Sequence, residues 1–229
     1  MATGKRKKVL MAWSSGKDSS MALARLKADE NIEVVALLTT VSEEYSRICM
    51  HGVRTTLLEA QAAATGLPLE KVPVLPKADN AAYDAVMHKT LCKYKDLGVE
   101  AVAFGDLFLE DIRKYREERL SLAGLHGIFP LWGEDTTGLS RSFIKNGFKA
   151  IITCVDTKAL DKNFAGMDYG AAFLGALPKT VDPCGENGEF HTFCYSGPVF
   201  SWPIEFTHGE SVLRDDRFYY HDLLEAQHD

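Results

Sequence analysis

Short apolar runs alternate with longer amphipathic stretches through the first two thirds of the chain. An apolar run of about four to eight residues is typical of a strand that is buried on both faces of a parallel sheet. One run is weaker than the others, and Pro73 predicts that it ends there. The pattern predicts five strands, over residues 9–13, 32–40, 69–74, 101–104 and 150–155.

Between these runs, apolar residues recur at spacings of three and four, the period of an amphipathic helix. Helices are predicted over residues 21–28, 53–64, 83–97 and 109–123. Gly98 and Gly124 follow the last two and are suited to end them. Strands that alternate with helices predict an α/β fold, in which helices cover both faces of a parallel sheet and the crossovers are right-handed.

The pattern changes after residue 157, where glycine, proline and aromatic residues become frequent and the helical period fades. The predicted elements here are a short helix within 168–177 and strands over 190–195, 199–200 and 203–207. We therefore expect two parts, an α/β domain over residues 1–157 and a smaller α+β domain over residues 158–229 that packs on it.

Composition excludes several classes of protein. Of the 229 residues, 46% are hydrophobic and 25% are charged, as in ordinary soluble proteins, and no apolar run could span a membrane. Basic residues 5–8 precede an apolar run that is too short for a signal peptide. The five cysteines lack a C-x-x-C pair, which favours reduced thiols and a cytoplasmic location. The net charge of −6 disfavours a broad nucleic-acid-binding surface.

The strongest local signal is a turn between the first predicted strand and the first predicted helix. Its residues are Ser14, Ser15, Gly16, Lys17, Asp18 and Ser19. A helix N-terminus presents free N–H groups and the positive end of the helix dipole, so this turn is suited to bind a phosphate. The alternative is a serine-rich helix cap without a ligand.

Each residue type in this turn has an expected contribution. The serine hydroxyls can donate hydrogen bonds, and Gly16 can adopt a positive φ and admit a phosphate close to the backbone. Lys17 supplies a positive charge. Asp18 can hold Mg²⁺ or cap the loop.

Two common phosphate-binding motifs do not fit this turn. Met11 stands where a Walker loop has its first glycine, and the G-x-G-x-x-G fingerprint is absent. The turn resembles instead the S-G-G-x-D-S loop of the PP-loop ATP pyrophosphatases, with Ser15 in place of the first glycine. The resemblance implies ATP and Mg²⁺ as cofactors, with cleavage between the α- and β-phosphates.

A second group of candidates follows the predicted strands over 32–40 and 101–104. If the first and fourth strands are neighbours, Gly105 and Asp106 face the same crevice as Ser14. Gly105 would let adenosine or the α-phosphate approach, and Asp106 would bind a ribose hydroxyl or Mg²⁺. The alternative is a plain turn in which Asp106 caps the next helix. Thr39 is placed to contact adenine through its backbone, and Arg113 or Arg116 to reach a phosphate or carboxylate.

The third group lies in residues 182–192, an irregular stretch that is dense in titratable side chains. Glu186, Glu189 and His191 are expected to bind substrate and perform acid–base work. The alternatives are a metal site on these three residues, a nucleophilic Cys184, and a purely structural turn.

Taken together, these motifs resemble the ATP-binding domain family of diphthine–ammonia ligase (diphthamide synthetase), within the N-type ATP pyrophosphatases. The shared segments are residues 14–19, 105–106, 130–132 and 185–192, and the resemblance covers nearly the whole chain. It implies a HUP-type (Rossmann-like) nucleotide domain with a smaller C-terminal domain that closes the cleft. Residues 45–51 match the archaeal and eukaryotic members only loosely, and 109–116 and 182–184 look more like the bacterial branch.

The resemblance implies an enzyme that transfers AMP to a substrate carboxylate, after which ammonia or an amine displaces AMP to give an amide. The resemblance supports this type of reaction more strongly than it supports diphthine as the acceptor. A nucleotide-binding protein without turnover and a PP-loop tRNA-modifying enzyme are the alternatives. The oligomeric state stays open, with a homodimer among the options.

Overall fold

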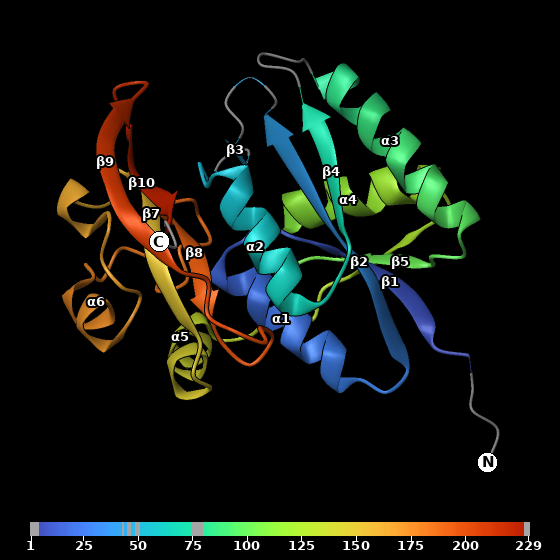
Figure 1. The fold of residues 1–229 in the computed structure, drawn as a ribbon, viewed down its shortest axis with the longest axis horizontal. Helices are drawn as coiled ribbons and strands as arrows, with labels where there is room; N and C mark the ends of the chain where they lie inside the picture. Colours follow the sequence, from blue (N-terminus) through green and yellow to red (C-terminus); the bar gives the residue numbers. More distant parts are fainter. Residues whose placement is uncertain (1–4, 43, 45–46, 49–50, 75–79, 227–229) are drawn as a thin grey trace.

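The computed structural model describes residues 5–42, 44, 47–48, 51–74 and 80–226, and it forms two sheets that lie side by side (Figure 1). Five strands of the first sheet are parallel, in the order β4-β2-β1-β5-β6, and the short β3 pairs antiparallel with the end of β2. These strands are β1 (Lys7–Ala12), β2 (Ile32–Ser42), β3 (Arg47–Ile48), β4 (Leu69–Val74), β5 (Ala101–Ala103) and β6 (His126–Ile128). The predicted parallel sheet is confirmed, and β1 and β5 are neighbours.

Helices cover both faces of this sheet, as predicted. They are α1 (Lys17–Ala28), α2 (Thr55–Thr65), α3 (Asn80–Asp96) and α4 (Glu110–Leu122). Successive side chains of β1 point to opposite faces: Val9 and Met11 pack with residues of α1 and α2, whereas Leu10 packs with residues of α3 and α4. Gly98 and Gly124 have positive φ values of 85° and 67° just beyond α3 and α4, which confirms the predicted helix ends.

The second sheet is antiparallel throughout, in the order β8-β7-β10-β9. Its strands are β7 (Lys149–Asp156), β8 (Phe190–Ser196), β9 (Phe206–Arg214) and β10 (Phe218–Glu225). Two helices, α5 (Thr136–Lys145) and α6 (Ala171–Ala176), and a 3-10 turn over Lys162–Phe164 accompany this sheet. Figure 1 shows this part beside α1 and α2, on the opposite side of the molecule from α3.

The assignment of residues 150–155 to the parallel sheet is wrong, because β7 belongs to the second sheet. All of β7 except Lys149 is buried. Burial on both faces removes polar alternation, so such a strand has the same sequence pattern in either kind of sheet. Residues 199–200 form no strand, and the strand expected over 203–207 begins at Phe206. We propose that the two parts divide between β6 and β7 rather than near residue 158.

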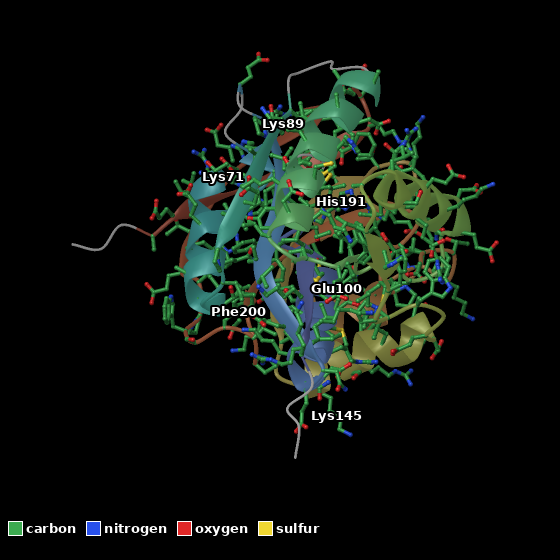
Figure 2. All side chains as sticks on the ribbon, turned by 90° about the vertical axis from the view of Figure 1, so that its right-hand side faces the viewer. Lys71, Lys89, Glu100, Lys145, His191 and Phe200 are labelled. Carbon is green, nitrogen blue, oxygen red and sulfur yellow. The ribbon has the colours of Figure 1, made fainter. Side chains whose placement is uncertain are left out.

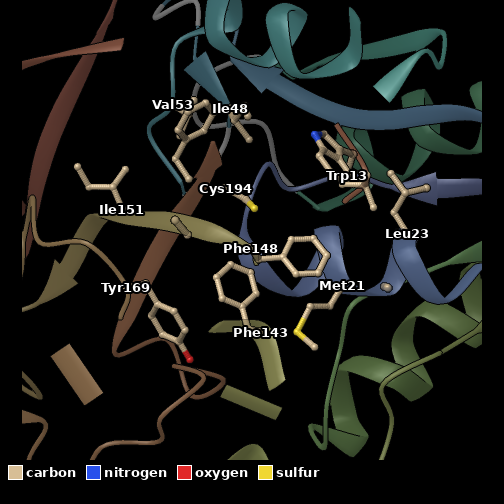
Figure 3. Packing of buried hydrophobic residues seen from close by; sticks show 14 of the residues in the cluster. Trp13, Met21, Leu23, Ile48, Val53, Phe143, Phe148, Ile151, Tyr169 and Cys194 are labelled. Carbon is tan, nitrogen blue, oxygen red and sulfur yellow. The ribbon is translucent and has the colours of Figure 1, made fainter. Parts of the chain in front are cut away.

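One continuous hydrophobic cluster joins the two sheets. Figure 3 shows Phe143 and Phe148 beside Met21 of α1, and their rings stack with centroids 5.1 Å apart. Gln61 of α2 is fully buried; its amide accepts a hydrogen bond from the Trp13 indole (2.9 Å) and donates to the Ser15 and Cys194 carbonyls (3.0 and 2.6 Å). This packing fixes β8 against the turn that follows β1.

Candidate active site

The turn after β1 has an unusual backbone conformation at Ser15, whose φ is 67°. This left-handed value explains why glycine is typical at this position of the S-G-G-x-D-S loop. The expected positive φ at Gly16 is wrong: its φ is −87°. Gly16 is needed instead for space, since a Cβ there would lie 3.2 Å from both His51 Cε1 and the Thr192 carbonyl oxygen.

Hydrogen bonds within the turn organise the serine hydroxyls. Ser14 Oγ accepts from the Gly16 N–H (3.3 Å) and donates to Ser19 Oγ (3.1 Å), which in turn donates to the Gly16 carbonyl (3.0 Å). Strand β8 also reaches this turn. The Lys17 N–H donates to Thr192 Oγ1 (3.0 Å), and the Cys194 N–H donates to the Ser15 carbonyl (2.9 Å). The C-terminal part therefore completes the loop at the start of α1.

Lys17 and Asp18 form a close ion pair at the start of α1. Lys17 Nζ lies 2.7 Å from Asp18 Oδ2, and it also donates to the Cys184 carbonyl. Burial disfavours the charged ammonium, but the Asp18 carboxylate outweighs it and raises the pKa of Lys17. Lys17 therefore carries a positive charge in the turn over residues 14–19, the predicted phosphate loop.

A cavity of about 1100 Å³ opens above this turn. This volume is at the upper end of ordinary small-molecule sites and is suited to a nucleotide together with part of a second substrate. The predicted site residues that line it are Ser14, Lys17, Asp18, Ser19, Thr39, Gly105, Asp106, Glu186 and His191. Ser15, Gly16 and Glu189 lie outside its lining. The structure thus brings together the candidates from all three sequence groups.

Gly105 packs directly against the first turn of α1. A Cβ at this position would lie 2.9 Å from the Asp18 carbonyl carbon and the Ser19 nitrogen, a distance that real Cβ atoms do not show. Because residue 105 has no Cβ, the connection between β5 and α4 can approach the phosphate loop. Thr39 donates its hydroxyl to the Trp13 carbonyl (2.7 Å), so its side chain supports the loop from β2.

Asp106 faces the cavity as part of an ion pair. Arg116 Nε lies 2.7 Å from Asp106 Oδ2, and Arg116 Nη2 donates to Oδ1 (3.1 Å). The guanidinium also lies over the Phe104 ring, 4.4 Å from its centroid. The alternative of Asp106 as a helix cap is wrong, because Leu109 is the N-cap residue of α4. Arg113 instead lies over the rings of Phe129 and Trp132.

The two glutamates of the 182–192 stretch occupy different environments. Glu186 faces the cavity and accepts a hydrogen bond from the Leu107 N–H (2.7 Å). Burial raises the pKa of Glu186 to about 7, and the charges of Asp18 and Asp106 add to the shift. A carboxyl with this pKa can exchange a proton near neutral pH.

Glu189 is buried, lies outside the cavity lining and forms hydrogen bonds within its own loop. Its Oε1 accepts from the Asp182 N–H (3.1 Å) and from the Asn187 amide (3.0 Å). These bonds hold the turn that presents Glu186 to the cavity. The geometry therefore gives Glu189 a positioning role.

His191 lines the cavity and faces His51, a residue outside the sequence-predicted site. Their ring centroids are 4.6 Å apart, and His51 Nδ1 lies 3.3 Å from the Thr192 carbonyl oxygen. Figure 2 shows His191 well inside the outline of the molecule, whereas Lys145 lies at its edge. The only sequence signal for His51 was its place at the end of the loosely matching stretch 45–51, of which residues 45–46 and 49–50 lie outside the described residues.

Metal and thiol chemistry were the alternatives for the third group. No cluster of three or more metal-ligating side chains occurs among the described residues. Burial raises the pKa of the Cys184 thiol to about 12, which leaves it protonated and unsuited as a nucleophile. The Asp18 carboxylate and nearby serine hydroxyls are oxygen ligands of the kind that Mg²⁺ uses together with nucleotide phosphates.

A parallel sheet with a serine–glycine loop at the carboxyl end of β1, facing a carboxylate-bearing C-terminal segment, defines an α/β nucleotide-dependent enzyme. Residues 7–126 match the diphthamide synthase N-terminal domain, and residues 135–224 match the diphthamide synthase C-terminal domain. The chain belongs to the diphthamide synthase family.

Similar proteins carry the name diphthine–ammonia ligase. The chain is 26% identical to the one from Danio rerio, over 89% of this chain and 88% of that protein. It is 27% identical to the one from Mus musculus, over 84% of this chain and 75% of that protein. It is also 27% identical to the one from Schizosaccharomyces pombe, over 90% of this chain but only 37% of that protein. A solved structure of the U34-tRNA thiolase NcsA from Methanococcus maripaludis is 18% identical to this chain, with a TM-score of 0.38. The match covers 62% of this chain and 59% of the thiolase chain.

Within the described ranges, none of the helices combines the length and apolar character that crossing a membrane requires.

Proposed function

We propose that the chain is an ATP-dependent ligase that transfers AMP to a substrate carboxylate and then forms an amide from ammonia or an amine. The observation that carries this proposal is the single cavity shared by the phosphate loop, the β5–α4 turn and the 184–192 loop. A nucleotide gripped at the loop and a carboxylate held opposite it would be placed for in-line attack on the α-phosphorus.

The phosphate loop supplies the electrostatic part of this chemistry. Negative charge develops on the departing pyrophosphate, and the helix N–H groups, the serine hydroxyls and the buried Lys17 ammonium stabilise it. Mg²⁺ bound by Asp18 and the nucleotide phosphates would neutralise further charge. Gly105 and Asp106 would lie near the nucleoside.

Glu186 is the group best placed to move a proton. Its carboxyl faces the cavity and has a pKa near neutrality, so it can accept a proton from the incoming nitrogen or donate one to a leaving oxygen. Its hydrogen bond to the Leu107 N–H keeps it oriented toward the β5–α4 turn.

The acceptor and the cellular setting are finer parts of the proposal. Diphthine is the acceptor in the name of the relatives, and it is the first carboxylate to test. The thiols of Cys92, Cys154, Cys184 and Cys194 are free, which supports a reducing compartment such as the cytoplasm. A homodimer stays a prediction.

The test is incubation with Mg²⁺, ATP labelled at the α-phosphate, ammonium and a panel of carboxylates that includes diphthine-bearing protein. Formation of AMP and pyrophosphate is expected, and formation of ADP would refute the proposal. Asp18→Asn and Glu186→Gln should each lower AMP formation at least tenfold. Glu118→Gln, on the exposed face of α4, is the matched control and should leave it unchanged. Tight ATP binding without AMP from any carboxylate would favour the nucleotide-binding protein, and salt-dependent tRNA binding the tRNA-modifying enzyme.

A further inference from the structure

The facing pair of His51 and His191 takes no part in the AMP transfer described above, and the sequence predicted only a general substrate-binding or acid–base role for His191. His51 follows β3 of the first sheet, and His191 lies on β8 of the second, so the pair spans the two parts of the molecule. Both side chains line the cavity. His51 has one hydrogen-bonding contact, to the Thr192 carbonyl, whereas no protein group within the described residues hydrogen-bonds the His191 ring. Ring nitrogens are therefore left for a small ligand.

Two residues that flank His51 are held by the hairpin of β9 and β10. Asp222 of β10 accepts from Arg47 (2.8 Å) and from Arg54 Nη2 (2.7 Å). Burial alone would raise the pKa of Asp222, but the two arginines outweigh it and lower the pKa to about 2. Gly52 packs on the Tyr220 ring, which a Cβ would approach to 2.8 Å. These contacts fix His51 over His191.

The surroundings of the pair keep both rings uncharged. Burial lowers the pKa of His51 to about 3 and that of His191 to about 4, and the Lys17 ammonium adds to both shifts. Burial and the nearby Lys17 ammonium also disfavour a cation bound between the two rings. A small neutral molecule with N–H groups, such as ammonia, suits two unprotonated imidazoles.

We propose that His51 and His191 form the binding site for the attacking nitrogen, as ammonia or a small primary amine. The proposal rests on the proposed function and specifies the second half of that reaction. The ring nitrogens accept hydrogen bonds from the N–H groups, and the lone pair of the nitrogen stays free to attack.

The step balances without a further reactant. The lone pair of ammonia attacks the acyl carbon of the adenylate, a C–N bond forms, and the C–O bond to AMP breaks. AMP leaves with the electron pair of that bond, and one N–H proton passes to the Glu186 carboxylate, which lines the same cavity and has a pKa of about 7. The products are the amide, AMP and a protonated Glu186, which releases its proton to solvent.

Binding of the nitrogen can be tested without knowing the acceptor. The full chain, loaded with Mg²⁺ and a non-hydrolysable ATP analogue, is titrated with ammonium chloride at mildly alkaline pH, and the imidazole C–H resonances are followed by NMR. We expect two resonances to shift saturably: the ones that disappear in His51→Gln and His191→Gln. Sodium chloride at equal ionic strength should not shift them. Absence of a saturable shift, or an equal shift with sodium, overturns the proposal.

The second measurement is the KM for ammonium, which can be determined once an acceptor has been identified. His51→Gln and His191→Gln should raise the KM for ammonium at least tenfold, a larger factor than their effect on pyrophosphate release. Asp222→Asn should raise the same KM several-fold through the loosened loop. His126→Gln, on the exposed edge strand β6, is the matched control. If pyrophosphate release falls as much as amide formation, the pair serves the nucleotide instead. Failure to form AMP with any acceptor would refute the proposed function while the NMR titration still decides the nitrogen site.

Discussion

Replacement of Gly105 by alanine tests whether the β5–α4 turn sets the geometry of the phosphate loop. The new Cβ would lie 2.9 Å from two backbone atoms of α1, at Asp18 and Ser19. Carbon atoms in favourable contact are about 3.5–4.0 Å apart, so the backbone must move by roughly 0.5–1 Å. Overpacking of this kind costs about 1–3 kcal/mol.

The strain in Gly105→Ala falls on the first turn of α1, which is the proposed phosphate site. If about 1.4 kcal/mol of it appears in binding, ATP affinity falls tenfold. Urea denaturation gives the free energy of unfolding, and calorimetric titration with ATP gives the affinity. Gly175→Ala is the matched control: it has no atom within 4 Å of the new Cβ and lies inside α6. There alanine should stabilise by about 0.5–1 kcal/mol.

Unchanged stability and unchanged ATP affinity in Gly105→Ala would refute both the close contact with α1 and the placement of the nucleotide. A loss of stability with unchanged ATP affinity would support the close contact but refute the placement of the nucleotide at the first turn of α1.

Three further predictions concern the same region. Ser15→Gly should raise the free energy of unfolding by about 0.5–1 kcal/mol in urea denaturation, because it relieves the left-handed φ of 67°; a loss of stability would contradict this. Gln61→Leu should cost about 2–4 kcal/mol in the same assay, since it removes a hydrogen bond from each of three partners, the Trp13 indole and the Ser15 and Cys194 carbonyls. A cost below 1 kcal/mol would argue against the importance of these bonds. The raised pKa of Glu186 means that its contribution to stability is fully present below its ordinary value of 4.5 and is lost as pH rises through about 7. The difference in unfolding free energy between the unmodified chain and Glu186→Gln should therefore fall by about 1–2 kcal/mol across that interval, allowing for solvent screening; a flat difference would refute the shift.

Local patterns predicted β1, β2, β4 and β5 of the first sheet but missed the short β3 and β6. Strands β1 and β2 lie between two helical layers, so their apolar runs are uninterrupted. The hairpin of β9 and β10 was missed beyond residue 207, because β9 is mostly exposed, β10 is mostly half-buried and neither strand carries an alternating pattern. Its pairing is fixed by long-range hydrogen bonds that no local window contains.

In the candidate site, too, local features could be predicted from the sequence and long-range contacts could not. The turn at residues 14–19 was recognised as a candidate because its residues are consecutive in the sequence, although its contacts with Thr192 and Cys194 were not foreseen. The role of Glu189 depends on which way its side chain turns, toward Asp182 and Asn187 rather than the cavity. His51 acquires a partner only when β8 of the second sheet comes to lie beside the loop after β3. Sequence spacing carries no information on either point.

The contact between Lys17 and Thr192 joins residues that are 175 positions apart. During synthesis a chain emerges from its N-terminus at about 5–20 residues per second, and early segments begin to fold first. The parallel sheet can therefore assemble while the partners of the phosphate loop, Thr192 and Cys194, have not yet been made. We therefore expect the proposed nucleotide site to be completed only late in translation, and a truncated chain that retains only the first sheet to bind ATP more weakly than the full chain.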